Sequence, residues 1–258
     1  MTSQQPVAVL VSGQASTSHA PELADVHLTV SHQGLPDARE ATTEQVRATQ
    51  ASLSSLLTSL SKKAIGAAGG VAESAPVSRW STGALSSSNV SEWDNEARKT
   101  RVIGFRVSIR LEARFVRSAF SGDATDNNKG WSKLAEFVKT LAATPDVELD
   151  NIDWVLTDAS ALRLTREVQV QAVVDAQQKA RNYASALGLQ QLQATEIVDG
   201  SYRGVAGGSG APGGPGAPYM ASRAMLRSTG PGGEESLFTF EPKDVEVTAN
   251  VNARFVAM

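Results

Sequence analysis

The sequence predicts an α+β fold: an amphipathic, mixed or antiparallel sheet with long helices packed on one face. Two segments, 101–115 and 245–255, alternate apolar and polar side chains as half-buried strands do. Two others, 37–63 and 159–187, keep the apolar spacing of helices. The elements follow the order β-β-α-β-β and then α-β-α-β-β, which suggests an internal duplication.

Composition bounds the class of protein. The 258 residues are 41% hydrophobic and 20% charged, which is typical of a soluble globular chain able to bury a core. A net charge of −3 argues against nucleic-acid binding, which usually requires a basic excess. The absence of cysteine excludes disulfides, thiolate nucleophiles and cysteine-ligated metals.

The N-terminal segment lacks the features of a secretion signal. It has no basic region, and the apolar run 7–11 is too short for a signal core. No apolar run approaches the roughly 20 residues of a membrane helix. As written, the sequence predicts a cytoplasmic protein without a membrane span, or a periplasmic or envelope protein if a leader has been trimmed.

Two strands are expected first. Residues 7–11 are apolar on both faces, which favours a strand inside a sheet, and 13–21 is expected to form a turn or bulge. In the second strand, 23–31, Val26, Leu28 and Val30 share one face.

A helix is predicted next, with Asp37 as its N-cap and Glu40 placed to close a capping box. It is expected to run to about Lys63, where glycines follow. The segment 71–90 suggests a strand and a loop, and 81–91 is polar and is expected to be loose.

The clearest strand spans 101–115. Its odd positions from Ile103 to Phe115 are apolar, and its even positions from Arg106 to Arg114 are polar. Because strands typically have about 5–6 residues, a bulge, a bend or an excursion beyond the main body is expected.

The rest of the chain continues the pattern. A helix is predicted over 131–141 and a strand over 147–157, with a bulge near Asn151 where the alternation slips. Further strands are predicted over 193–200 and 245–255.

The helix over 159–187 carries an unusual stripe of small residues. Its members recur every four positions: Ala172, Ala176, Ala180 and Ala184. Small side chains allow a close approach to a neighbouring surface, so the stripe predicts a tight seam between helix and sheet. Gly188 stands where a helix favours a left-handed residue to end.

The segment 203–233 is rich in glycine, proline, alanine and serine. Such a composition predicts a flexible loop, or a segment that a partner orders. A phosphate-binding loop is disfavoured, because no Gly-Lys-Ser/Thr and no helix pattern follow the glycines.

Three features resemble the SIMPL-domain family (YggE-like bacterial proteins, formerly a domain of unknown function). The first is a short strand ending in Gly13 with a Pro-Glu-Leu-Ala approach at 21–24 to the next strand. The second is Ala-Val-Val-Asp-Ala-Gln-Gln-Lys-Ala at 172–180, continuing to Ala-Leu-Gly-Leu at 186–189. The third is a variable loop before a terminal amphipathic strand, 244–255.

The resemblance implies one SIMPL-type domain over 1–258, with the flexible loop at 203–233. It also implies a stress-related or signalling-associated protein of a family whose members build ring-like homo-oligomers. Family members usually carry a secretion signal, which this sequence does not show. The family offers no catalytic residues to carry over.

Arginines along one face of the strand 101–115 form the main candidate site. Arg106, Arg110 and Arg114, with Arg101 and Arg117 nearby, make a basic stripe. The stripe suggests an interface or an anion-binding surface. The alternative is a solvated sheet face whose charge is balanced by Glu112 and by carboxylates on neighbouring strands.

The other candidate residues point to structure rather than chemistry. The histidines are His19, His27 and His32, and the tryptophans are Trp80, Trp93, Trp131 and Trp154. His27 and His32 fall on opposite faces of one strand, so no joint metal pair is predicted. The tryptophans are scattered and indicate packing or interface positions. No Gly-x-Ser-x-Gly elbow is present, and no cofactor or metal site is expected.

The favoured interpretation is a non-enzymatic, self-associating protein that forms a ring-like homo-oligomer through sheet edges, with a stress-related or scaffolding role. One alternative is a small-ligand-binding protein or hydrolase with a cleft between the two halves of the chain. Another is a monomeric adaptor that binds a partner through 203–233.

Overall fold

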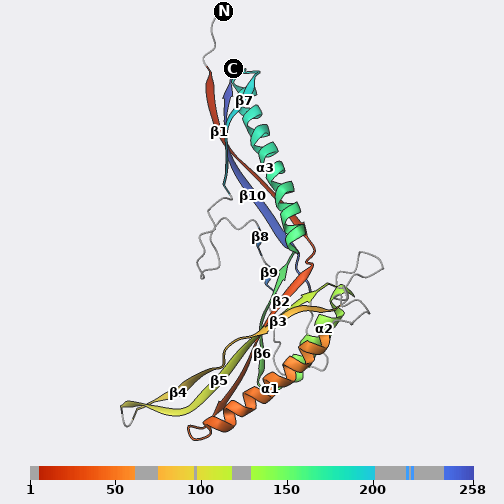
Figure 1. The fold of residues 1–258 in the computed structure, drawn as a ribbon. Coiled ribbons are helices and arrows are strands. Elements are labelled where there is room, and N and C mark those ends of the chain that lie inside the picture. The colour runs from red at the N-terminus through yellow and green to blue at the C-terminus, as the bar shows by residue number, and fades with distance from the viewer. Residues whose placement is uncertain are drawn as a thin grey trace, which may run out of the picture. The chain divides into compact units, whose positions relative to one another are not determined.

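The computed structural model describes residues 6–61, 75–95, 98–117, 129–200, 219–220, 222–223 and 241–258. It confirms the α+β prediction and divides the strands between two antiparallel sheets (Figure 1). The chain forms two compact units. The first unit holds Met1–Ala20, Leu156–Ser222 and Asp244–Met258, and the second holds Pro21–Val155 and Arg223–Lys243. The units are therefore not the two sequence halves.

The first unit is a sheet covered by one long helix. Its elements are β1 (Val7–His19), α3 (Asp158–Ala186), β7 (Leu192–Asp199), β8 (Tyr219–Met220) and β10 (Val245–Ala257). The strands run in the order β1-β10-β7, and β8 also pairs with β10. The prediction of a strand inside the sheet over 7–11 is wrong, because β1 is an edge strand among the described strands and its second apolar face, with Leu10 71% exposed, is not buried. The helix α3 packs on β1 and β10 (Figure 1). Alternation buries every odd residue of β10 on the side of the helix, as predicted.

The alanine stripe is the seam of this unit. All four alanines predicted to form it are at most 3% exposed. Opposite them lies Gly13, where an added Cβ would meet the Ala172 carbonyl oxygen and the Ala176 nitrogen. The prediction of a turn or bulge over 13–21 is wrong, because β1 continues through Gly13 to His19. Glycine here permits close packing instead of breaking the strand.

Both ends of α3 follow the sequence signals. The Thr157 side chain accepts a hydrogen bond from the Ser160 N–H, which caps the first turn. Gly188 has φ +75°, the left-handed conformation expected after a helix.

The second unit is a larger sheet with two helices on one face. Its elements are β2 (Leu23–Gly34), α1 (Arg39–Leu60), β3 (Val77–Thr82), β4 (Ser86–Asp94), β5 (Lys99–Val116), the 3-10 turn η1 (Lys129–Trp131), α2 (Ser132–Ala143), β6 (Val147–Val155) and β9 (Ser222–Arg223). The order is β3-β5-β2-β6-β9, and β4 also pairs with β5. The helix α1 contacts β2 and β5, and α2 contacts β6.

The core of the second unit lies between these helices and the sheet. Val26, Leu28 and Val30 of β2 are fully buried, as their alternation predicts. The ring centroids of Phe115 and Phe137 lie 5.1 Å apart, so β5 packs directly on α2. The bulge predicted near Asn151 is confirmed. His27 pairs with Asn151 and Leu28 with Leu149, which leaves Asp150 as the extra residue.

The start of α1 differs from the prediction. The helix begins at Arg39 after Ala38, and no side-chain hydrogen bond caps it, so the capping box of Asp37 and Glu40 is wrong. Tertiary contacts hold this turn instead. The Arg39 guanidinium lies 5.3 Å from the centroid of the Phe105 ring. The helix ends at Leu60, and Lys63 lies outside the described residues.

The prediction that 81–91 is loose is also wrong. This segment contains the end of β3 and most of β4. Serines at 86–88 and 91 give β4 no apolar alternation, so its sequence resembles a loop. Its order comes from β5, with which every residue from Ser86 to Asp94 is paired, with one register shift between Val90 and Ser91.

The long strand β5 is confirmed and has 18 residues. Its partner β2 ends at Gly34, opposite Phe105, so β5 continues beyond that point with only β4 beside it among the described strands. Ile103 is also the extra residue of a bulge, because Val90 pairs with Gly104 and Ser91 with Val102, and it is 41% exposed although its alternation with Phe105 predicted burial. The long strand therefore contains both an expected bulge and an expected excursion, the two-stranded extension.

Candidate functional surfaces

The open face of the second sheet carries the arginines singled out in the sequence. Because side chains alternate along a strand, the polar positions of β2 and β5 face away from the helices. The register aligns Asp25 with Arg114, His27 with Glu112 and Thr29 with Arg110. The face is therefore a set of polar cross-strand pairs.

The three arginines of the stripe differ in their surroundings. Arg114 donates two hydrogen bonds of 2.6 Å to the Asp25 carboxylate, and both side chains are about one-quarter exposed. Arg106 donates to the Gln33 side chain at 3.3 Å, and it is exposed. Arg110 is exposed on the same face, opposite Thr29. Arg114 is thus paired with an acidic side chain. Arg106 has only the neutral Gln33 as a partner, and both Arg106 and Arg110 are exposed to solvent.

A histidine between two carboxylates lies beside this pair. His27 Nδ1 is 3.6 Å from Glu112 Oε1, and His27 Nε2 is 3.4 Å from Asp153 Oδ2. The carboxylates come from the strands on either side of β2. Since each carboxylate faces a different ring nitrogen, this arrangement suits a chain of polar contacts across three strands better than ligation of one metal ion.

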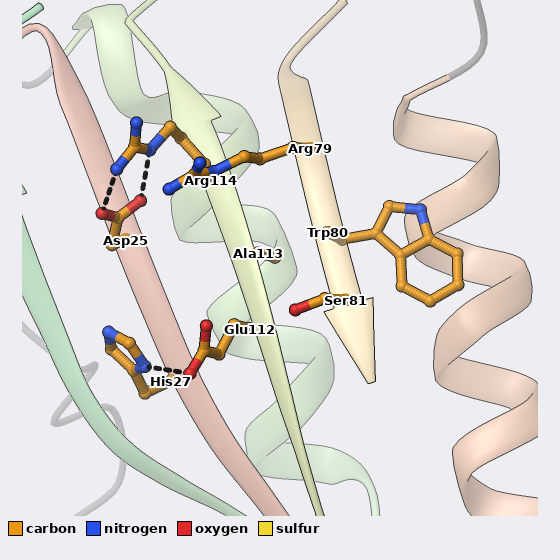
Figure 2. Close-up of a pocket in the computed structure, with 8 residues that line it drawn as sticks. All are labelled: Asp25, His27, Arg79, Trp80, Ser81, Glu112, Ala113 and Arg114. Atoms are coloured by element: carbon orange, nitrogen blue, oxygen red, sulfur yellow. Dashed lines mark hydrogen bonds and ion pairs between the residues drawn. The ribbon is translucent and has the colours of Figure 1, made fainter. Parts of the chain in front are cut away.

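A hollow of about 300 Å³ opens over these residues. Figure 2 shows the Arg114–Asp25 pair and the His27–Glu112 pair along its floor, with Arg79 reaching toward Arg114 from β3. Trp80 points the other way, toward a helix. Polar groups of both signs line the hollow, and they neutralise one another. The geometry agrees with a solvated sheet face whose charge is balanced by neighbouring carboxylates.

The other candidate residues are dispersed. His19 hydrogen-bonds the Ala20 carbonyl, and His32 lies 3.0 Å from Asp146. Trp131 and Trp154 are buried and packed edge to face, with ring centroids 4.9 Å apart. The described residues contain no group of three or more histidines and acidic residues placed to hold a metal. The predicted loop 203–233 lies outside the described residues, apart from β8 and β9.

None of the described helices has both the length and the apolar character required to cross a membrane.

The sheet edges form a second kind of candidate surface, which the sequence indicates only in general terms. A strand edge offers unpaired N–H and C=O groups to another chain unless it is protected. On β3 the register shifts at Ser78, whose hydroxyl donates to the Arg114 carbonyl at 3.3 Å. On β7 it shifts at Thr195, whose hydroxyl donates to the Arg254 carbonyl at 3.1 Å. Both edges are therefore broken by bulges.

The edge of β1 is protected differently. The Asp175 carboxylate of α3 accepts a hydrogen bond from the Gln14 N–H at 2.9 Å. Lys179, one turn further along, donates to the Ser12 carbonyl at 3.0 Å and to Asp175 at 2.7 Å. The Asp175–Lys179 ion pair therefore hydrogen-bonds two backbone groups on the outer edge of β1. The two hydrogen bonds of Asp175 lower its pKa below the ordinary value, and the Lys179 bond is the larger cause.

Among the described residues, no side chain hydrogen-bonds the outward backbone groups of β4. The Arg39 guanidinium donates to the Ser87 hydroxyl at 3.3 Å, and the register against β5 shifts between Val90 and Ser91, with the extra residue on β5. The Gly83 N–H donates to the Arg110 carbonyl, so even-numbered residues of β5 direct their backbone groups toward β3 and β4. Their partners Ser86 and Ser88 therefore face β5. Ser87 and Asn89 direct their N–H and C=O groups outward. In this strand only Val90 is even half-buried among the residues whose side chains are described.

The SIMPL family, described as "Protein of unknown function (DUF541)", matches residues 9–255. No curated protein matches the chain. The match spans β1 at one end and β10 at the other, and so includes both compact units. The chain belongs to the SIMPL family.

Proposed function

We propose that the protein is non-enzymatic and that it self-associates into a ring-like homo-oligomer with a stress-related or scaffolding role. The observation that carries the proposal is the open outer edge of β4. A nine-residue strand that buries almost none of its side chains contributes little to the core of its own unit. The stress-related part rests on the family resemblance alone.

The two-stranded part of β4 and β5 that continues beyond β2 supports the same proposal, because it exposes apolar side chains that a partner could bury. Trp93, Val102 and Ile103 are 57%, 44% and 41% exposed. A two-stranded hairpin is marginally stable by itself in water, and it gains from a third strand or a covering surface. Trp93 lies opposite Thr100 and Val102 opposite Ser91, which places Trp93 and Val102 diagonally on one face. A second copy of the chain could cover this face and pair with the β4 edge.

The basic stripe fits this contact. Arg106 lies opposite Ser88, and the Arg110 carbonyl is bonded to Gly83, just before β4 begins. A strand added to β4 would lie two strand spacings, about 10 Å, from the β5 backbone, a distance that the long side chains of both exposed arginines can span. The proposed partner surface therefore carries acidic or polar acceptor side chains at these positions.

A proline on the outer edge tests the proposal. Asn89→Pro removes an outward N–H without taking a hydrogen bond from the β4–β5 ladder, a position that strands tolerate. We expect the wild-type protein to have a mass above one chain in light scattering at micromolar concentration, and Asn89→Pro to shift it toward the monomer. Asn89→Ala removes the same side chain but keeps the N–H, so it should leave the mass unchanged.

The measured mass also distinguishes the geometry of association. A dimer would indicate that β4 pairs with β4 about a two-fold axis, whereas a larger closed assembly would indicate contact with a different surface on the next copy, as a ring requires. A strictly monomeric wild-type protein would overturn the proposal of self-association. A dimer would overturn the ring.

A further inference from the structure

The free edge of β1 is a second place where another strand could add. β1 pairs with β10, and no described strand lies on its other side. Its N–H and C=O groups alternate between the two sides, and the Gln14 N–H and the Ser12 carbonyl point outward. These are the groups that an incoming strand would need at the middle of the edge.

Asp175 and Lys179 already form hydrogen bonds with both of these backbone groups. The carboxylate accepts from the outward N–H, and the ammonium donates to the outward carbonyl two residues earlier. The donor and acceptor roles are those of a neighbouring strand. The two side chains are spaced i,i+4, so they project together from α3 and bond to each other at 2.7 Å.

The helix is held at this point by packing. Gly13 lies between the two engaged residues, and its missing side chain admits the α3 backbone at Ala172 and Ala176. Ala172 and Ala176 are completely buried. The seam therefore places Asp175 and Lys179 against the edge, and a replacement for Gly13 would also displace them.

We infer that the Asp175–Lys179 pair closes the β1 edge against a second copy of this chain, and that opening it creates an additional association surface. The inference concerns a different edge from the proposed β4 contact, and it holds whether or not that contact forms. With β1 closed, the outward groups at residues 12 and 14 cannot template another strand. With the pair removed, the free edge of a 13-residue strand becomes available.

The test is a pair of substitutions that removes both hydrogen-bonding groups and keeps residues that favour a helix. Asp175→Ala with Lys179→Ala should raise the mass in light scattering above that of the parent protein. The measurement is made in the wild-type chain and again in the Asn89→Pro variant. A rise in both backgrounds supports closure of β1 even if the β4 proposal fails.

Two controls make the result specific. Lys133→Ala with Glu136→Ala removes a similar exposed pair of α2, bonded at 2.9 Å, and should leave the mass unchanged. Adding Gln14→Pro to the Asp175/Lys179 variant removes the exposed edge N–H and should return the mass to the parent value. An unchanged mass in the Asp175/Lys179 variant overturns the inference. So does a raised mass that persists with Gln14→Pro, because it would reflect non-specific aggregation.

Discussion

Gly13 shows how one residue can decide the packing of a helix on a sheet. Glycine usually marks a turn, but here it lies inside a strand because the α3 backbone passes too close for a side chain. The alanines on the facing helix are the complementary half of the same contact. Both halves are visible in the sequence, but their pairing across about 160 positions is not.

Gly13→Ala should therefore destabilise the protein by about 1–3 kcal/mol, the usual cost of overpacking a tight core contact. Denaturant unfolding followed by circular dichroism measures the change. Gly83→Ala is the matched control, because the nearest atom to its Cβ would be the Arg110 carbonyl oxygen at an ordinary 3.4 Å. It should stay within about 0.5 kcal/mol of wild type. Equal losses in both variants would contradict the account of the seam.

Asp25 and Arg114 show, again at the scale of single residues, that residue type alone does not reveal which arginines are available to a partner. The sequence presents Arg106, Arg110 and Arg114 as equivalent members of one stripe. Only the register of β2 against β5 brings Asp25 to Arg114, where a carboxylate can accept two bonds from the planar guanidinium. The charge available to an outside partner is therefore concentrated on Arg106 and Arg110.

At the scale of elements, the link between α3 and β1 depends on an ionised carboxylate. Asp175 has a pKa below its ordinary value because Lys179 and the Gln14 N–H both bond its charged form. Its contribution to stability is fully present above the ordinary pKa of 3.8, and it is lost as pH falls through the lower folded value.

Wild-type protein and Asp175→Asn should therefore differ in unfolding free energy at pH 7, and the difference should shrink as pH falls below about 4. Thermal or urea unfolding at a series of pH values gives the measurement. Glu136→Gln is the comparison for an ion pair within one helix. Lys133 lowers the Glu136 pKa, so its difference from wild type should also shrink at low pH, but it should be the smaller of the two because the pair joins no strand. A difference that stays constant with pH would refute the role of the ionised carboxylate.

Elements with a local signature could be predicted from the sequence. The alternation in β5 and β10 and the alanine stripe of α3 show in the sequence which face is buried, so these three elements and their buried faces could be predicted. The sequence of β4 has no such pattern, because its serines are exposed and its order comes from a partner strand. The His27 contacts and the β1 ion pair could not be predicted, since each joins residues that only the register or the helix seam brings together.

At the scale of the whole molecule, the chain builds its first unit from three separated segments. β10 is the central strand of that unit's sheet, and β1 and β7 both pair with it. The second unit takes its main strands from one continuous stretch, Pro21–Val155, with helices to cover them.

Ending the chain after Lys243 should therefore unfold the first unit and spare the second. Without β10, the α3 alanines lose half of their seam, and β7 loses its only described neighbour. Hydrogen exchange followed by mass spectrometry should show rapid exchange in α3 with protection retained in β2 and β5. Loss of protection throughout would mean that the second unit cannot fold without the first.

The place of β10 at the centre of its sheet also sets an order of events during synthesis. The ribosome releases β1 first and β10 last, so the strand that must lie between β1 and β7 arrives when almost everything else has been made. Until β10 has been made, the backbone groups on both edges of β1 lack a partner strand. The helix α3 is finished well before β10, and its Asp175 and Lys179 can occupy one of those edges while the chain is still growing. A contact that closes an edge in the finished protein would then also protect the nascent chain from pairing with its neighbours on the same messenger.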